Sequence, residues 1–94
     1  MENQHRKISG YRELSQEEID LMNRIKAKGA ELLALQSEPA AMIGQQHFDK
    51  SHGPAEEFER FEAAEPMRWA NIGKTDIQTG IMALVRAVAQ PTGV

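Results

Sequence analysis

The chain has 94 residues, no cysteine and a net charge of −3, which sets narrow limits on what it can be. A chain of this length forms one domain and buries only about 60–65% of its unfolded surface, so its core is thin. The absence of cysteine excludes disulfides, Cys-bound zinc and a thiol nucleophile. Chains with so small a core often complete it by oligomerising, and we expect that here.

The charge is unevenly distributed along the chain. Residues 31–65 hold two Lys/Arg against eight Asp/Glu, giving −6, whereas residues 1–30 and 66–94 carry +1 and +2. An acidic protein is a poor binder of nucleic-acid polymers, but a small anion needs only a few local cations. The polar first twenty residues do not resemble a secretory signal, and no apolar run approaches the ~18 residues of a membrane span. We therefore expect no association with a membrane.

Helical periodicity dominates the chain, and no alternating strand pattern competes with it. After an N-terminal arm over residues 1–14, Ser15 fits an N-cap and Glu18 completes a capping box. The first helix is predicted over 15–36, with an apolar stripe made of Ile19, Met22, Ile25, Gly29, Leu32 and Leu33. Gly29 costs roughly 1 kcal/mol relative to alanine inside a helix, so another helix or a ligand should approach closely there.

Prolines divide the rest of the chain. Pro39 predicts a kink and then a loop over residues 37–53, unless it starts a longer helical segment. A short helix is predicted over 54–64 and a last helix over 66–90, before a tail at 91–94. The predicted fold class is all-α: an antiparallel helical hairpin with a shorter connecting helix, in a single domain that assembles into a compact homo-oligomer.

The first candidate site combines the entrance to the first helix, Gly10, Tyr11 and Arg12, with Lys26 further along it. A tyrosine ring can stack on a base and the cations can pair with an anion, although packing and solvated roles are favoured on pattern alone. Lys26 lies eleven residues after Ser15, about 16 Å along the axis, so one chain would struggle to bring Tyr11 and Lys26 onto one compact ligand. Two chains packed head to tail would form a two-fold pocket, which suits a ligand with two bases and two phosphates.

A second candidate anion site lies near the start of the last helix, where the sequence places Arg68, Trp69, Lys74 and Thr75. Cations and backbone N–H groups near a helix N-terminus favour anions. The alternative is that Trp69 anchors the core and the charges are solvated.

No other pattern predicts chemistry. The histidines near residues 47–52 have too few neighbouring ligands for a standard metal site, and the glutamates of 56–65 fit a solvated acidic face. No Gly-rich phosphate loop, nucleophile–base pair or HExxH motif occurs in the sequence. We therefore predict no catalytic residues, no metal, no cofactor and no enzymatic activity.

Four motifs together resemble a known family. They are Gly10-Tyr-Arg-x-Leu-Ser15, Leu21-Met-Asn-x-Ile-Lys26-x-Lys-Gly29-x-Glu-Leu, Arg68-Trp69, and Thr75-Asp-Ile-Gln-Thr-Gly-Ile-Met-Ala-Leu-Val-Arg-Ala-Val-Ala-Gln-Pro91. The chain is similar to the phage anti-CBASS sponges, which share a helical hairpin domain with phage anti-Thoeris sponges. The resemblance covers nearly the whole chain, and only the acidic middle, 37–65, is not distinctive.

The resemblance implies a non-enzymatic protein that sequesters cyclic oligonucleotide messengers in the cytoplasm of the infected bacterial host. The implied ligands are cyclic dinucleotides such as 3',3'-cGAMP, held between protomers of a hexamer, with cyclic trinucleotides at separate sites in some members. Carried over by motif, Tyr11 would stack on a base, Lys26 would pair with a phosphate, and Gly10 and Arg12 would shape the same pocket. The second candidate site would hold the trinucleotide.

Two other functions stay open on the residues themselves. One is a helical protein-interaction module that binds a host protein through its acidic middle. The other is a hydrolase of the same messengers, which the lack of a nucleophile or metal motif disfavours.

Overall fold

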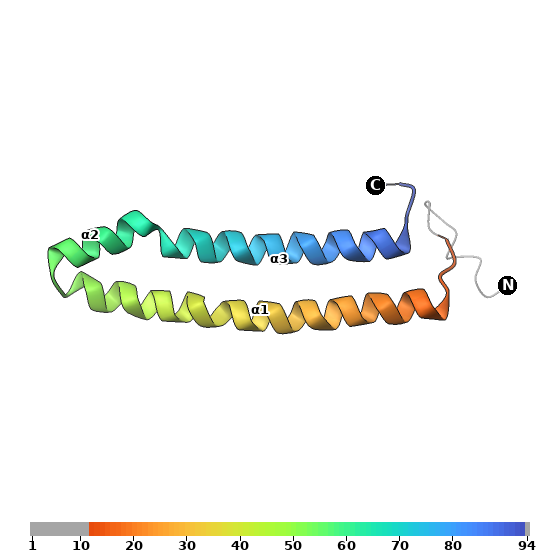
Figure 1. Cartoon of the computed structure of the whole chain (residues 1–94), viewed down its shortest axis with the longest axis horizontal. Coiled ribbons are helices and arrows are strands. Elements are labelled where there is room, and N and C mark those ends of the chain that lie inside the picture. The colour runs from red at the N-terminus through yellow and green to blue at the C-terminus, as the bar shows by residue number, and fades with distance from the viewer. Residues whose placement is uncertain (1–11, 94) are drawn as a thin grey trace.

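The computed structural model describes residues 12–93, which fold into three helices. α1 spans Gln16–Ser51, α2 spans Ala55–Ala64 and α3 spans Pro66–Ala89. α1 and α3 run antiparallel side by side, and α2 completes the return at the turn end of the hairpin (Figure 1). The predicted all-helical hairpin with a short connecting helix is confirmed. None of the helices in residues 12–93 combines the length and the apolarity that a membrane span requires.

α1 begins where the capping box predicts. Ser15 has extended backbone angles, and its Oγ accepts a hydrogen bond of 3.1 Å from the backbone N–H of Glu18. The Glu18 carboxylate in turn accepts one of 2.8 Å from the backbone N–H of Ser15. Two N–H groups that the helix itself cannot satisfy are thereby paired, which fixes the start of α1 at Gln16.

The predicted loop over residues 37–53 is wrong, because α1 continues through Pro39 to Ser51. The stripe that faces the other helices persists beyond the proline, through the half-buried side chains of Leu33, Gln36, Ala40, Ile43 and Lys50. A proline inside a helix costs about 3 kcal/mol, partly because the carbonyl four residues earlier loses its donor. Here that carbonyl belongs to Leu35. Both Leu35 and Pro39 lie on the exposed side of α1, so water can solvate the carbonyl. Continued packing on α2 and α3 therefore outweighs the cost.

The turn between α1 and α2 is fastened by ion pairs around Glu57. Its carboxylate accepts hydrogen bonds of 2.8 Å from Lys50 Nζ of α1 and 2.8 Å from Arg60 Nε of α2. These bonds, that of Arg60 above all, lower the pKa of Glu57 from 4.5 to about 2. Phe61 then packs α2 onto α1 and is only 6% exposed. The acidic segment is thus partly engaged in holding the hairpin together.

A single residue separates α2 from α3. Glu65 adopts left-handed backbone angles, φ 50° and ψ 50°, and Pro66 follows as the first residue of α3. These angles cost a residue with a side chain about 1–2 kcal/mol. Because left-handed angles cannot continue a right-handed helix, α2 ends sharply before Glu65. Pro66 has no backbone N–H, so it leaves no donor without a partner at the first helical position. The predicted start of the last helix at residue 66 is confirmed.

α3 packs closely against α1 at Gly29, which is the buried residue of α1. A Cβ built on Gly29 would lie 2.7 Å from Cγ1 of Ile81 and closer still to its Cδ1. The side chain of Ile81 thus occupies the volume that any other residue would need. The predicted packing reason for this glycine is confirmed, and the group that approaches is another helix.

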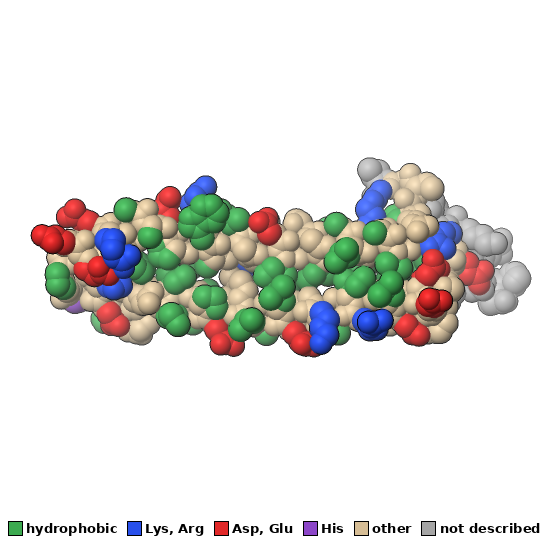
Figure 2. All heavy atoms as spheres, in the orientation of Figure 1, with side chains coloured by type: hydrophobic (Ala, Val, Ile, Leu, Met, Phe, Trp, Pro, Cys, Tyr) green, Lys and Arg blue, Asp and Glu red, His purple; other side chains and the backbone are tan. Residues whose placement is uncertain are grey.

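The core of one hairpin is thin. Phe61 is the only buried hydrophobic side chain in the described residues, and even it is 6% exposed. The radius of gyration is 20.4 Å, against about 12 Å for a compact chain of this length. Figure 2 shows hydrophobic side chains exposed along much of the seam between α1 and α3 on one face. The large apolar side chains left exposed are Leu21, Leu32, Leu35, Met42, Phe48, Met67, Trp69, Met82 and Leu84. An isolated hairpin therefore leaves a large apolar surface in water.

Candidate functional site

A shallow hollow of about 360 Å³ lies between α1 and the end of α3, beside Lys26. α1 contributes Lys26, and α3 and the following tail contribute Ile81, Met82, Val85, Arg86, Ala89 and Pro91. Its floor is mostly apolar, and no described carboxylate lines it. The exposed Lys26 side chain makes no ion pair or hydrogen bond with any described residue. A free cation beside an apolar floor suits a ligand with an anionic group and a flat apolar group.

Arg86 is a second cation in this hollow, and it was not among the residues predicted from the sequence. It lies sixty residues from Lys26 in the chain, and only the pairing of α1 with α3 brings the two to one place. Arg86 lies within the motif from Thr75 to Pro91, but nothing there singles it out, because its neighbours on α3 form an ordinary helical pattern of apolar residues. To predict that Lys26 and Arg86 lie together, one must know the register of α1 against α3. The sequence alone does not determine that register.

Arg12 joins the start of α1 to the end of α3. Its guanidinium donates to the carbonyls of Val88 at 2.9 Å and Ala89 at 3.2 Å, and it pairs with the Glu18 carboxylate at 2.5 Å. The carbonyls at a helix C-terminus lack partners within the helix and favour a cation. In the hairpin, Arg12 therefore acts as a clamp at the open end. Its expected part in a ligand pocket stays a prediction.

The other two members of the first candidate site, Gly10 and Tyr11, lie outside the described residues. The expected separation of Tyr11 and Lys26 can therefore be checked only through the length of α1. Because α1 is a continuous helix from Gln16, Lys26 lies roughly 15 Å along the axis from its first residue. The inference that two chains complete one pocket thus stays a prediction.

The clamp lowers the pKa of Glu18 from 4.5 to about 2, because Arg12 and then the Ser15 N–H hydrogen-bond its ionised form. A carboxylate whose pKa is lower in the folded state stabilises the fold fully above about pH 4.5, and that stabilisation is lost as the pH falls towards 2. We expect urea unfolding at constant protein concentration to show declining stability over this window. Glu18→Gln should remove part of the decline, because glutamine does not titrate.

Exposed Glu56, which makes no ion pair with a described residue, provides the control. Glu56→Gln should leave the pH dependence close to that of the unaltered protein. If Glu18→Gln and Glu56→Gln give the same curve as the unaltered protein, the Arg12–Glu18 pair does not contribute to stability in solution.

The second candidate site is brought together only in part. Arg68 and Thr75 line a hollow of about 550 Å³ with Asn71, Ile72 and Asp76. Lys74 is not part of it, since six residues along a helix turn a side chain about 240° from Arg68. Trp69 is 59% exposed and does not anchor a core; its ring lies 5.2 Å from the Arg68 guanidinium carbon. Asp76 adds a negative charge to the hollow, so an anion would depend strongly on Arg68.

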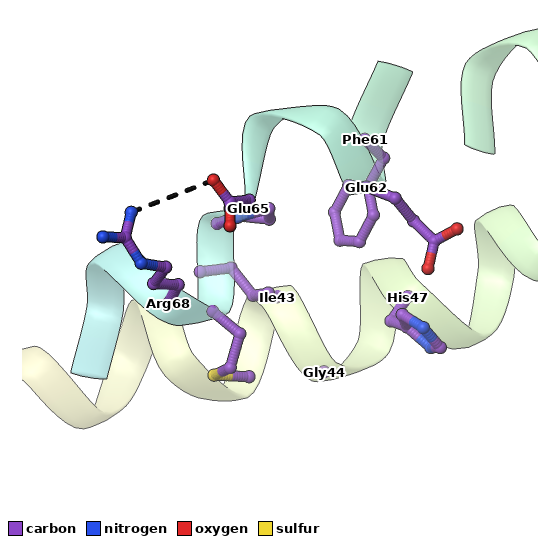
Figure 3. A pocket seen from close by; sticks show the side chains of 9 residues that line it. Ile43, Gly44, His47, Phe61, Glu62, Glu65 and Arg68 are labelled. Atoms are coloured by element: carbon purple, nitrogen blue, oxygen red, sulfur yellow. Dashed lines mark ion pairs between the residues drawn. The ribbon is translucent and has the colours of Figure 1, made fainter. Parts of the chain in front are cut away.

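A third hollow, of about 410 Å³, lies where all three helices meet (Figure 3). Ile43, His47 and Phe61 face it, and Glu65 pairs with Arg68 at 3.8 Å on its rim. The sequence could not predict it, because its α1 residues fall in or beside the segment expected to be a loop. Within residues 12–93, no three His, Asp or Glu side chains gather to hold a metal ion.

Residues 5–89 match the family described as Acb2/Tad1, hairpin domain. The chain belongs to the Acb2/Tad1 hairpin-domain family. This Acb2/Tad1 hairpin is also similar to a protein of Pseudomonas phage JBD67 named anti-CBASS protein 2, with 56% identity over an alignment 110 positions long that covers 99% of each chain. The family resemblance inferred from the motifs is confirmed. The matched region of this Acb2/Tad1 member contains Lys26, Arg68 and all of α1, α2 and α3.

Proposed function

We propose that this protein counteracts CBASS immunity by binding cyclic oligonucleotide messengers and keeping them, uncleaved, from their effectors. The name of the phage JBD67 relative and the family membership support the anti-CBASS role. The observation that carries the binding role is the hollow beside Lys26, which combines a free cation with an apolar floor. A phosphodiester would pair with the ammonium group, while a base or sugar would cover Met82 and Val85. The site of action would be the cytoplasm of the infected bacterium.

The pocket would be completed by a second copy of the chain, in a homo-oligomer that we propose to be a hexamer. Exposed apolar side chains along α1 and α3, such as Leu32 and Leu84, support association, because burying them contributes about 25 cal/mol per Å². Within a two-fold pair, Tyr11 of one protomer would lie over Lys26 of its partner. Each cyclic dinucleotide would then meet the same two side chains at both of its ends.

Calorimetry with 3',3'-cGAMP tests the binding step, and chromatography of the ligand recovered after denaturation tests the absence of cleavage. We expect saturable binding, recovery of the intact cyclic dinucleotide after long incubation, and a native mass that is a multiple of the protomer mass. No heat with any of several cyclic dinucleotides would contradict the binding role. A linear product would contradict sequestration and favour a hydrolase.

We propose the hollow at Arg68 and Thr75 as the place for a cyclic trinucleotide, with Trp69 beside it. The apposition of Arg68 and Thr75 on one face of α3 supports this, whereas Lys74 lies off that face. Arg68→Ala should abolish cyclic trinucleotide binding and leave cyclic dinucleotide binding intact. The alternative function, capture of a host protein by the acidic middle, has weaker support because Glu57 is held by Lys50 and Arg60.

A further inference from the structure

The side chain of Arg86 lines the same hollow as Lys26 but is held to the end of the chain. Its Nη2 donates a hydrogen bond of 2.8 Å to the carbonyl of Gly93 in the tail that follows α3. Pro91 of that tail also lines the hollow. Among the described residues Arg86 pairs with no carboxylate, so its positive charge is not neutralised.

A guanidinium has five N–H donors, and one neutral carbonyl occupies only a small part of this capacity. Hydrogen bonds from a guanidinium to a phosphate are roughly twice as strong as those between neutral groups, and they are often bidentate. A phosphate that enters the hollow would therefore compete well against the Gly93 carbonyl. The last turn of α3 also carries the negative end of the helix dipole, which favours a cation at Arg86.

We propose that Arg86 is a second phosphate-binding residue of the Lys26 site and exchanges the Gly93 carbonyl for a phosphate oxygen of the ligand. This inference rests on the proposed function, since it assigns Arg86 to the same cyclic dinucleotide. Lys26 of α1 and Arg86 of α3 would hold the phosphate from the two sides of the hairpin seam. Binding would free the tail from its contact with Arg86.

The test is calorimetry with 3',3'-cGAMP on the full chain and on Arg86→Gln, Arg86→Lys and Lys28→Gln. Arg86→Gln should weaken binding by about 10- to 100-fold, the effect of losing a charge-assisted contact. Arg86→Lys should recover part of the loss, because it keeps the charge without the planar fork. Lys28→Gln removes the same charge from an exposed α1 side chain outside the hollow and should change affinity less than twofold.

A structural role for Arg86 through the tail is tested in a chain shortened by residues 92–94. If Arg86 binds phosphate, Arg86→Gln should cost the same factor in this background. A loss that disappears there would overturn the proposal, because Arg86 would then act only by holding the tail. Circular dichroism and native mass exclude loss of fold as the cause in either background.

The outcomes separate this inference from the function on which it rests. If the unaltered protein binds, Lys26→Gln weakens binding and Arg86→Gln does not, the assignment of Arg86 is wrong and the proposed function stands. If the unaltered protein binds no cyclic dinucleotide, both are overturned.

Discussion

Lys26→Ala is expected to reduce the affinity for a cyclic dinucleotide by about 100-fold or more while the oligomer stays intact. Each charge-assisted hydrogen bond to a phosphate contributes about 1.5–3 kcal/mol, and the proposed two-fold pocket presents Lys26 to each ligand twice. The lysine makes no ion pair with the described residues, so its removal leaves no group of the hairpin without a partner. Calorimetry gives the affinity, and the native mass gives the state of assembly.

Lys28→Ala is the matched control for this experiment. Lys28 lies two residues away on α1, its side chain is 81% exposed, and it contacts Glu31 at 3.7 Å. The net charge changes by the same amount, so a general electrostatic effect would weaken binding equally in both variants. If Lys26→Ala instead dissolves the oligomer, Lys26 belongs to an interface and our assignment of it to the ligand site is wrong.

Gly29→Leu should have the largest effect on stability, lowering the free energy of unfolding by about 2 kcal/mol. A leucine gains roughly 0.8 kcal/mol of helix propensity over glycine, but its Cβ alone would overlap the side chain of Ile81. The two long helices would have to move apart along the seam. Urea unfolding at fixed protein concentration measures the loss.

A double variant shows whether Ile81 is the cause. Ile81→Ala removes the atoms that occupy the space next to Gly29, so it should recover part of the stability of Gly29→Leu despite losing packing of its own. Gly80→Leu is the matched control, since nothing lies within 4 Å of a Cβ at that exposed glycine of α3. If Gly80→Leu lowers the free energy of unfolding as much as Gly29→Leu does, the close approach of α3 is not the reason that Gly29 is required.

Local signals predicted the fold well where they act within one turn of helix. Ser15 and Glu18 lie three residues apart, so the cap could be recognised before any tertiary structure was known. Pro66 set the start of α3 in the same way. Pro39, by contrast, led to a predicted loop where α1 in fact continues. The cost of a proline is local, whereas the packing that outweighs it comes from α2 and α3.

The site was less predictable because its residues meet across the hairpin. Lys26 was found as a cation beside a stripe, but its neighbour Arg86 required the register of α1 against α3. Arg12 was expected at a ligand, and the structure shows it bound to carbonyls that lie 76 and 77 residues away. Lys74 was grouped with Arg68 by proximity in sequence, although the turn of the helix points them in different directions.

The Arg12 clamp also has a consequence for the order in which the hairpin forms. Contacts such as Lys50 with Glu57 close a short segment, whereas Arg12 with Val88 closes nearly the whole chain. Closing a longer loop costs more entropy, so we expect pairing to start at the turn and to reach the open end last. That end carries Lys26 and Arg86, and it should exchange its amide hydrogens fastest without ligand. A ligand bound there would then stabilise the least stable part of the molecule. Equal protection of the amide hydrogens at the turn and at the open end would contradict the proposed order of pairing.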